Sequence, residues 1–82
     1  MRYEIEVTKH FERLLRKLDI EIIKRIRDKI LELKTDPYAN KPLVGQLSGL
    51  RSMRVGDCRI LYMMKKKKSI LVHVEHRRVV YR

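Results

Sequence analysis

The chain has 82 residues, of which 44% are apolar, and a formal net charge of +11. This length is too short for two hydrophobic cores and predicts a single domain over residues 1–82. The composition excludes a membrane-spanning helix, because no apolar run approaches ~20 residues, and an internal disulfide, because Cys58 is the only cysteine. We therefore expect a protein of the reducing cytoplasm without a secretory signal peptide.

The positive charge is distributed unevenly along the chain. Residues 1–36 carry ten basic and eight acidic side chains, a net charge of +2, whereas residues 37–82 carry eleven and two, a net charge of +9. A lysine-rich surface selected for thermal stability would normally contain added acids as well as added bases. The asymmetry therefore favours an anionic partner, namely nucleic acid, an acidic protein or both.

The N-terminal third predicts a strand followed by a helical hairpin. Residues 2–7 alternate between apolar and charged side chains, as in a half-buried strand. Residues 11–18 then carry apolar side chains at helical spacing, with Thr8 as the expected N-cap. A second helix is expected to begin after Asp19, and its apolar stripe over residues 22–33 ends ahead of the first proline. Such a hairpin needs an apolar sheet to cover.

The remainder predicts a loop and two β-hairpins. Residues 37–49 carry both prolines and two of the three glycines and are expected to form a connecting loop. Strands are expected over residues 50–55, 58–64 and 69–76, and the tail 77–82 can add a short edge strand. Gly56 and Asp57 form the first hairpin turn, in which glycine supplies a positive φ. Four lysines at 65–68 cannot pack in a core and form the tip of the second hairpin.

The order β-α-α-β-β-β predicts an α+β fold, with one antiparallel sheet, the helices on one face and the other face partly free. Met53, Met63 and Met64 are expected to fill the core between the sheet and the helices, because methionine packs irregular gaps. Cys58 is expected to be a small buried side chain rather than a nucleophile, because no second cysteine or strand-paired histidine is evident.

The first hairpin turn sets two arginines opposite each other. With Gly56 and Asp57 as the turn, Val55 faces Cys58 and Arg54 faces Arg59. Like charges directly across a strand pair destabilise it by up to ~1 kcal/mol. The two side chains therefore either splay into solvent or bind an anion between them through charge-assisted hydrogen bonds. The other arginines of the basic half favour the anion-binding interpretation.

The segment LSGLRSMRVGDCRILY (Leu47–Tyr62), followed one strand later by HRRVVYR (His76–Arg82), resembles the RelE/ParE toxin superfamily. The resemblance covers essentially the whole chain, and the pairing of R-V-G-D-x-R with the terminal motif is its most specific part. It implies a toxin of a type II toxin–antitoxin system with a RelB-like antitoxin as partner. The RelE branch further implies a ribosome-dependent endoribonuclease, which cuts messenger RNA by attack of the ribose 2′-hydroxyl on the adjacent phosphate.

The resemblance also implies roles for individual residues. Arg59 would stabilise the scissile phosphate, with Arg54 beside it. Tyr81 corresponds to a C-terminal tyrosine on which a base stacks, and His76 to a histidine that some branches use as a general acid or base. Further basic residues expected to contact RNA are Arg51, Arg77, Arg78, Arg82, Lys65, Lys66, Lys67 and Lys68. Strand alternation puts Arg51 on the face opposite to Arg54 unless the strand bulges.

Two positions depart from the pattern of the family. Glu75 replaces the glycine that commonly precedes the histidine, and its carboxylate would repel substrate unless it orients His76 or pairs with an arginine. Ser52 stands where some RelE proteins carry an additional catalytic lysine. His10 and His73 are expected to be structural.

Two other functions remain open. The first is a ParE-like toxin that inhibits DNA gyrase by protein contact, and the second is a non-catalytic basic RNA-binding module. No metal-ligand spacing, phosphate-cradling glycine loop or pair of catalytic carboxylates occurs in the sequence. We therefore expect no cofactor and no metal.

Overall fold

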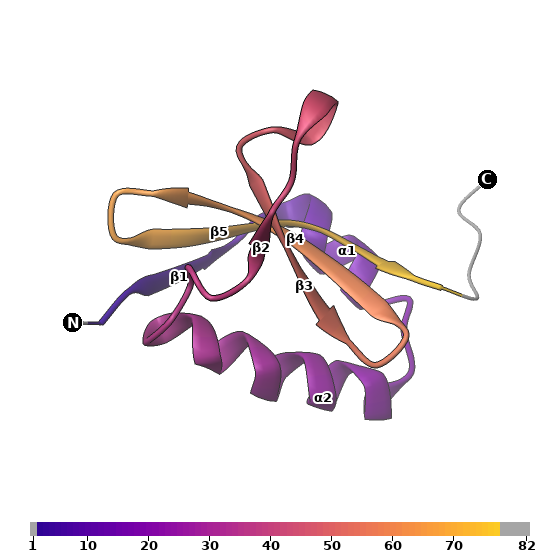
Figure 1. Cartoon of the computed structure of the whole chain (residues 1–82). Helices are drawn as coiled ribbons and strands as arrows, with labels where there is room; N and C mark the ends of the chain where they lie inside the picture. Colours follow the sequence, from indigo (N-terminus) through magenta and orange to yellow (C-terminus); the bar gives the residue numbers. More distant parts are fainter. Residues whose placement is uncertain (1, 78–82) are drawn as a thin grey trace.

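The computed structural model describes residues 2–77 of the chain. Within this range it contains two α-helices and five strands (Figure 1). The elements are β1 (Glu4–Val7), α1 (Lys9–Leu15), α2 (Ile20–Ile30), β2 (Lys41–Pro42), β3 (Leu50–Val55), β4 (Cys58–Lys65) and β5 (Lys68–His76), with 3-10 turns at Leu31–Lys34 and Gly45–Leu47. The predicted α+β class and the order of its elements are confirmed.

The strands form one sheet with the order β1-β5-β4-β3-β2. Neighbouring strands are antiparallel, as predicted, except for β1, which pairs with β5 in parallel. The prediction of a purely antiparallel sheet is therefore wrong for β1, because the helices connect it to the far side of the sheet. The short strand β2 lies within residues 37–49, where the sequence predicted only a loop. Two residues are too few to show an alternating pattern, and Pro42 is compatible with an edge strand because its missing N–H is not needed there.

The helix boundaries follow from the capping residues. Thr8 caps α1 as predicted, because its hydroxyl oxygen accepts a hydrogen bond from the backbone N–H of Phe11 at 3.2 Å. The same hydroxyl donates to the carbonyl of Leu71 at 2.8 Å and so ties the start of α1 to β5. Asp19 occupies the N-cap position of α2 but makes no side-chain capping bond. No helix within residues 2–77 is long and apolar enough to cross a membrane.

One hydrophobic core lies between the sheet and the two helices. Its buried members are Phe11, Leu14, Leu18, Ile26, Leu33, Met53, Cys58, Ile60, Tyr62, Leu71 and Val74. Because both helices contribute to this one cluster, they cover the same face of the sheet (Figure 1). We call the opposite side of the sheet the open face.

The prediction for the three methionines is only partly confirmed. Met53 is buried in the core and Met64 packs against it, as expected. The prediction is wrong for Met63, which is 36% exposed. Met63 shares its strand alternation with Arg59 and therefore points to the open face.

A bulge in β5 determines which of its side chains face the helices. Leu61 pairs with His73 and Tyr62 pairs with Leu71, so Val72 is an extra residue on β5. The extra residue allows Leu71 and Val74, which are three positions apart, both to be fully buried in the core. Beyond Val72 the faces are exchanged, so His73 and Glu75 point to the open face while Val74 and His76 point to the helices.

The second hairpin has a strained turn, which gives a first prediction. Lys65 pairs with Lys68, so Lys66 and Lys67 form the turn, and Lys66 has a φ of +58°. A side chain with a Cβ is disfavoured in this conformation by roughly 1–2 kcal/mol. Lys66→Gly is therefore expected to raise the free energy of unfolding by about 1 kcal/mol in urea denaturation, because glycine relieves that strain but loses more chain entropy. Lys67→Gly, at a position without a positive φ, is the control, and an equal gain there would contradict the explanation.

Candidate nucleic-acid interface

The predicted arginine pair is present on the open face. Arg54 lies directly opposite Arg59, and Val55 lies opposite Cys58. The turn between them has Gly56 at a φ of +58°, as the sequence predicted. Both arginine side chains are exposed. The backbone therefore holds the two positively charged residues side by side at the surface of the sheet.

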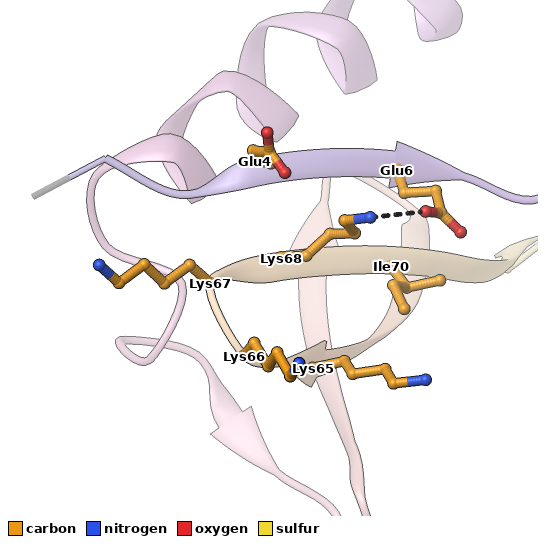
Figure 2. Close-up of a pocket in the computed structure, with 7 residues that line it drawn as sticks. All are labelled: Glu4, Glu6, Lys65, Lys66, Lys67, Lys68 and Ile70. Atoms are coloured by element: carbon orange, nitrogen blue, oxygen red, sulfur yellow. Dashed lines mark hydrogen bonds and ion pairs between the residues drawn. The ribbon is translucent and has the colours of Figure 1, made fainter.

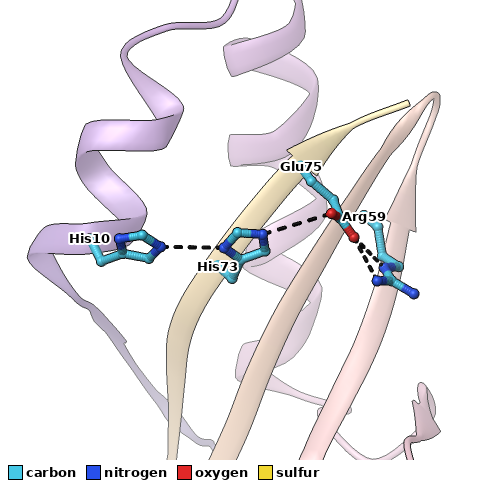
Figure 3. Close-up of polar contacts among 4 residues, drawn as sticks. All are labelled: His10, Arg59, His73 and Glu75. Carbon is cyan, nitrogen blue, oxygen red and sulfur yellow. Dashed lines mark hydrogen bonds and ion pairs between the residues drawn. The ribbon is translucent and has the colours of Figure 1, made fainter. Parts of the chain in front are cut away.

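Glu75 lies opposite Arg59 on the neighbouring strand β5 and forms an ion pair with it. Its Oε1 atom accepts from the Nε atom of Arg59 at 2.9 Å and lies 2.6 Å from the Nη2 atom (Figure 3). The two side chains are partly exposed, so the ion pair contributes little to stability. The sequence predicted that Glu75 repels the substrate unless it orients His76 or pairs with an arginine, and in the structure it pairs with an arginine. The carboxylate occupies the guanidinium edge that a phosphate oxygen would use.

Removing the charge of Glu75 is therefore expected to strengthen anion binding. Glu75→Gln leaves the guanidinium of Arg59 available, and we expect about three-fold tighter binding of a short single-stranded RNA, as for an exposed charge pair. One additional phosphate contact should also steepen the dependence of log K on log salt by about 0.7. Fluorescence anisotropy at several salt concentrations measures both quantities.

The matched control for this prediction is Glu12→Gln on α1. Glu12 also pairs with an arginine, at 4.0 Å from Arg16, so the control removes the same charge away from the open face. An equal gain in affinity for both variants would mean that net charge, and not the release of Arg59, governs binding.

Two histidines extend the row of charged groups toward α1. The Nδ1 atom of His73 lies 3.3 Å from the Nε2 atom of His10, and the two rings stack with their centroids 5.5 Å apart. The Nε2 atom of His73 lies 3.8 Å from the Oε2 atom of Glu75. Figure 3 shows the resulting chain from His10 through His73 and Glu75 to Arg59. The sequence had suggested only structural roles for these histidines, because the bulge that turns His73 to the open face has no clear sequence signal.

His76 is not brought together with the arginine pair. It is opposite Cys58 and on the helix face of the sheet, where it lines a small cavity of about 180 Å³ with Cys58 and Arg25. Cys58 is only 2% exposed, which agrees with the prediction of a small buried side chain. The expectation that it has no strand-paired histidine is wrong, because the bulge in β5 sets His76 opposite it. Burial raises the pKa of its thiol, and the neighbouring Asp57 carboxylate raises it further.

Arg51 also lies away from the pair, as strand alternation predicted. Its Nη1 atom donates to the carbonyl oxygens of Asn40 at 2.6 Å and Tyr38 at 3.3 Å, and its guanidinium lies over the Tyr38 ring at 4.9 Å. The buried Tyr62 holds the same loop, because its hydroxyl donates to Pro37 and accepts from Asn40. Burial raises the pKa of Tyr62. Arg51 therefore anchors the loop before β2.

The turn between β3 and β4 gathers two further arginines. The backbone N–H of Arg77 donates to the carbonyl of Asp57 at 2.8 Å, and its side chain is exposed. Arg25 of α2 lies against the turn, since a Cβ on Gly56 would be 3.6 Å from its Nη1 atom. Sequence reasoning missed Arg25, because nothing in the helix pattern shows which turn the helix will contact. The predicted contacts Arg78, Tyr81 and Arg82 lie outside the described residues.

The lysine tip, residues 65–68, lies at the other end of the sheet. Its four lysines line a hollow of about 630 Å³ together with Glu4, Glu6 and Ile70 (Figure 2). The Nζ atom of Lys68 lies 3.2 Å from the Oε1 atom of Glu6. Two carboxylates in the same hollow reduce the positive potential there. The lysine tip is therefore a weaker anion site than its four charges suggest.

Among residues 2–77, no three His, Cys, Asp or Glu side chains are arranged to hold a metal ion. The polar groups described on the open face are guanidinium groups, a carboxylate and imidazoles. Such groups can bind a phosphate, stabilise a developing negative charge and transfer protons.

Comparison with solved structures identifies the class of fold. A chain of the RelBE2 toxin–antitoxin complex of Mycobacterium tuberculosis is 28% identical, with a TM-score of 0.88, over 94% of this chain and 100% of that chain. A mutant RelE toxin of Escherichia coli in the free state is 17% identical, with a TM-score of 0.77, over 95% and 86%. A chain of the archaeal RelE–RelB complex of Pyrococcus horikoshii is 21% identical, with a TM-score of 0.74, over 98% and 100%. The last two likenesses show the fold alone, and the fold is that of RelE.

The family follows from the sequence comparison. Residues 2–81 match the family model of the ParE toxin of type II toxin–antitoxin systems. The chain therefore belongs to this toxin family, within the RelE/ParE superfamily. A comparison with curated proteins found no match.

Proposed function

We propose that this toxin is a ribosome-dependent endoribonuclease that cleaves messenger RNA without a metal ion and so inhibits translation. The observation that carries the proposal is the pair Arg54 and Arg59, held side by side on the open face. A phosphate between them turns their mutual repulsion into charge-assisted hydrogen bonds. The similarity to a chain of a RelBE complex supports the RelE branch of the superfamily.

The proposed reaction needs positive charge aimed at the scissile phosphate. Attack by the ribose 2′-hydroxyl produces a crowded phosphorane with additional negative charge, which Arg59 and Arg54 would stabilise. The phosphate must first displace Glu75 from Arg59. Arg77, beside the same turn, would contact a neighbouring phosphate. For Tyr81 we propose the base-stacking role implied by the resemblance.

The proposed partners are a RelB-like antitoxin and, during cleavage, the ribosome with its messenger in the cytoplasm. Several large apolar side chains of this chain are exposed to solvent and would suit an antitoxin with an apolar stripe. They are Ile20 at the start of α2, Leu31 directly after α2, and Val44 and Leu47 in the connecting loop, with Val44 the most exposed at 86%. Acidic residues of such an antitoxin would also cover the arginine pair.

The proposal is tested with purified ribosomes programmed with a defined messenger. Primer extension should reveal cleavage at codon-defined positions in the presence of the toxin and ribosomes, and none with the messenger alone. The products should carry 2′,3′-cyclic phosphates and should form in the presence of a metal chelator added after the ribosomes are assembled, at a concentration that leaves them intact. Absence of codon-positioned cleavage would disprove the proposal.

A second candidate function is inhibition of DNA gyrase, and the match to the ParE family model favours it. In that case the arginines would contact protein rather than RNA. Cleaved DNA–gyrase complexes that accumulate without ribosomes would support this candidate. Binding to RNA without product in the ribosome assay would instead indicate a non-catalytic RNA-binding module.

A further inference from the structure

We propose that the imidazole of His73 is the proton acceptor in RNA cleavage by this toxin and that His10 positions it. This inference rests on the endoribonuclease function proposed above. It deepens that function by naming the group that activates the 2′-hydroxyl, a task for which the guanidinium groups of Arg54 and Arg59 are unsuited, because arginine stays protonated.

His73 is a close neighbour of the phosphate-binding arginine on the open face. It pairs with Leu61 on β4, two residues from Arg59, and lies two residues from Glu75 on its own strand. Diagonal neighbours on one face of a sheet are about 7–8 Å apart, within reach of long side chains. An imidazole at this place can reach the ribose attached to a phosphate that Arg59 holds.

The contacts of His73 orient its ring for proton transfer. The proposed role requires the tautomer with the proton on Nδ1, which then donates to the Nε2 atom of His10 at 3.3 Å and leaves the Nε2 atom of His73 as the basic nitrogen. That nitrogen faces Glu75, at 3.8 Å from its Oε2 atom, and Glu75 in turn holds Arg59 (Figure 3). A phosphate that displaces Glu75 from Arg59 therefore arrives on the basic side of the ring.

The charged and titratable groups around His73 suit a proton acceptor. His10 faces His73 from α1, Glu75 faces it from the same strand, and Arg59 faces it from β4. The nearest acidic residue on β1 is Glu6, which is paired with Lys68. While Arg59 and Glu75 are paired, their charges cancel. Once a phosphate takes the place of Glu75 on Arg59, the released carboxylate stabilises the imidazolium that forms beside it.

The proposed step balances in atoms and charge. The Nε2 atom of His73 takes the proton of the 2′-hydroxyl as the bond between O2′ and phosphorus forms. The bond between phosphorus and O5′ breaks, its electron pair leaves with the 5′-oxygen, and this oxygen takes a proton from water. The products are a 2′,3′-cyclic phosphate and a 5′-hydroxyl, and the imidazolium returns its proton to solvent.

The geometry favours His73 over His76 for this role. The two lie three residues apart on β5, but the bulge at Val72 puts them on opposite faces of the sheet. His76 lines the cavity beside Cys58 on the helix side, whereas His73 shares the open face with Arg59.

The test is a single-turnover pH–rate profile with programmed ribosomes and saturating toxin. The rate for the wild-type toxin should fall toward low pH with a slope of one proton, because a protonated imidazole cannot accept the proton of the 2′-hydroxyl. His73→Gln should be slower by roughly 100-fold or more and should lose this slope. His76→Gln should keep the slope. His10→Gln should be slower but should also keep the slope, because the slope reports the protonation of His73.

Further measurements separate a chemical role of His73 from a structural one. Each variant is checked for a cooperative thermal transition, and His73→Ala should be partly rescued by added imidazole, which a loss of packing would not permit. A His73→Gln toxin that retains the slope would overturn the inference and leave the endoribonuclease function intact. A wild-type pH–rate profile without the slope would also overturn the inference about His73 and leave the endoribonuclease function intact. A wild-type toxin that does not cleave at all would overturn the proposed function itself.

Discussion

Arg59→Ala is expected to lower the rate of ribosome-dependent cleavage by roughly 10²–10³-fold, the loss typical for one donor that stabilises a transition-state charge. The substitution removes the guanidinium that faces Arg54 across the strand pair. It also leaves the carboxylate of Glu75 without the group that holds its Oε1 atom at 2.6 Å. The negative charge then faces the incoming phosphate. Single-turnover cleavage at saturating toxin measures the chemical step directly.

Three further variants separate the contributions to this effect. Arg59→Lys keeps the charge but not the paired donors, and it should recover only part of the rate. The double variant Arg59→Ala, Glu75→Gln removes the repelling carboxylate and should be faster than Arg59→Ala alone. Arg16→Ala, on the exposed end of α1, removes the same charge at a distance and should cleave as the wild type does. Undiminished cleavage by Arg59→Ala would contradict the proposed role.

Phe11→Ala is expected to produce the largest loss of stability, about 3–5 kcal/mol. Phe11 is the only phenylalanine of the chain and is 1% exposed in the core between α1 and the sheet. A domain of this size has a total stability of only about 4–12 kcal/mol at the usual value per residue. The variant should therefore lose a large part of its total stability in the absence of antitoxin. Urea denaturation followed by circular dichroism at 25 °C measures the loss.

The control for Phe11 is Val44→Ala in the connecting loop. Val44 is 86% exposed, so its truncation should change the free energy of unfolding by no more than about 0.5 kcal/mol. A loss below 1 kcal/mol for Phe11→Ala would show that the packing of α1 contributes little to the stability of the fold.

Local sequence patterns were sufficient to predict both helices, every strand except β2, and the first hairpin. Period-2 alternation, helical spacing and the Thr8 cap predicted the strands and helices close to their observed bounds. Local chemistry suffices for this, because each signal lies within a few residues of the element that it predicts. The turn at Gly56 likewise fixed Arg54 opposite Arg59, since a two-residue turn leaves one register for the strands that it joins.

The side chains of β5 that lie beside this arginine pair depend instead on how the sheet packs against the helices. A regular hairpin around Lys66 and Lys67 would set Val74 opposite Arg59 and would turn His76 toward the open face. The core instead buries both Leu71 and Val74, and the bulge at Val72 makes this possible.

The reversal of alternation beyond the bulge follows from packing at a distance. It puts Glu75 opposite Arg59 and His73 opposite Leu61, and it moves His76 to the helix side. No local pattern in the sequence reveals this, because the bulge depends on what the helices require from the sheet. The arginine pair can thus be predicted from the local sequence, because it depends on one two-residue turn. The positions of His10, His73 and Glu75 beside it cannot, because they depend on how the helices pack on the sheet.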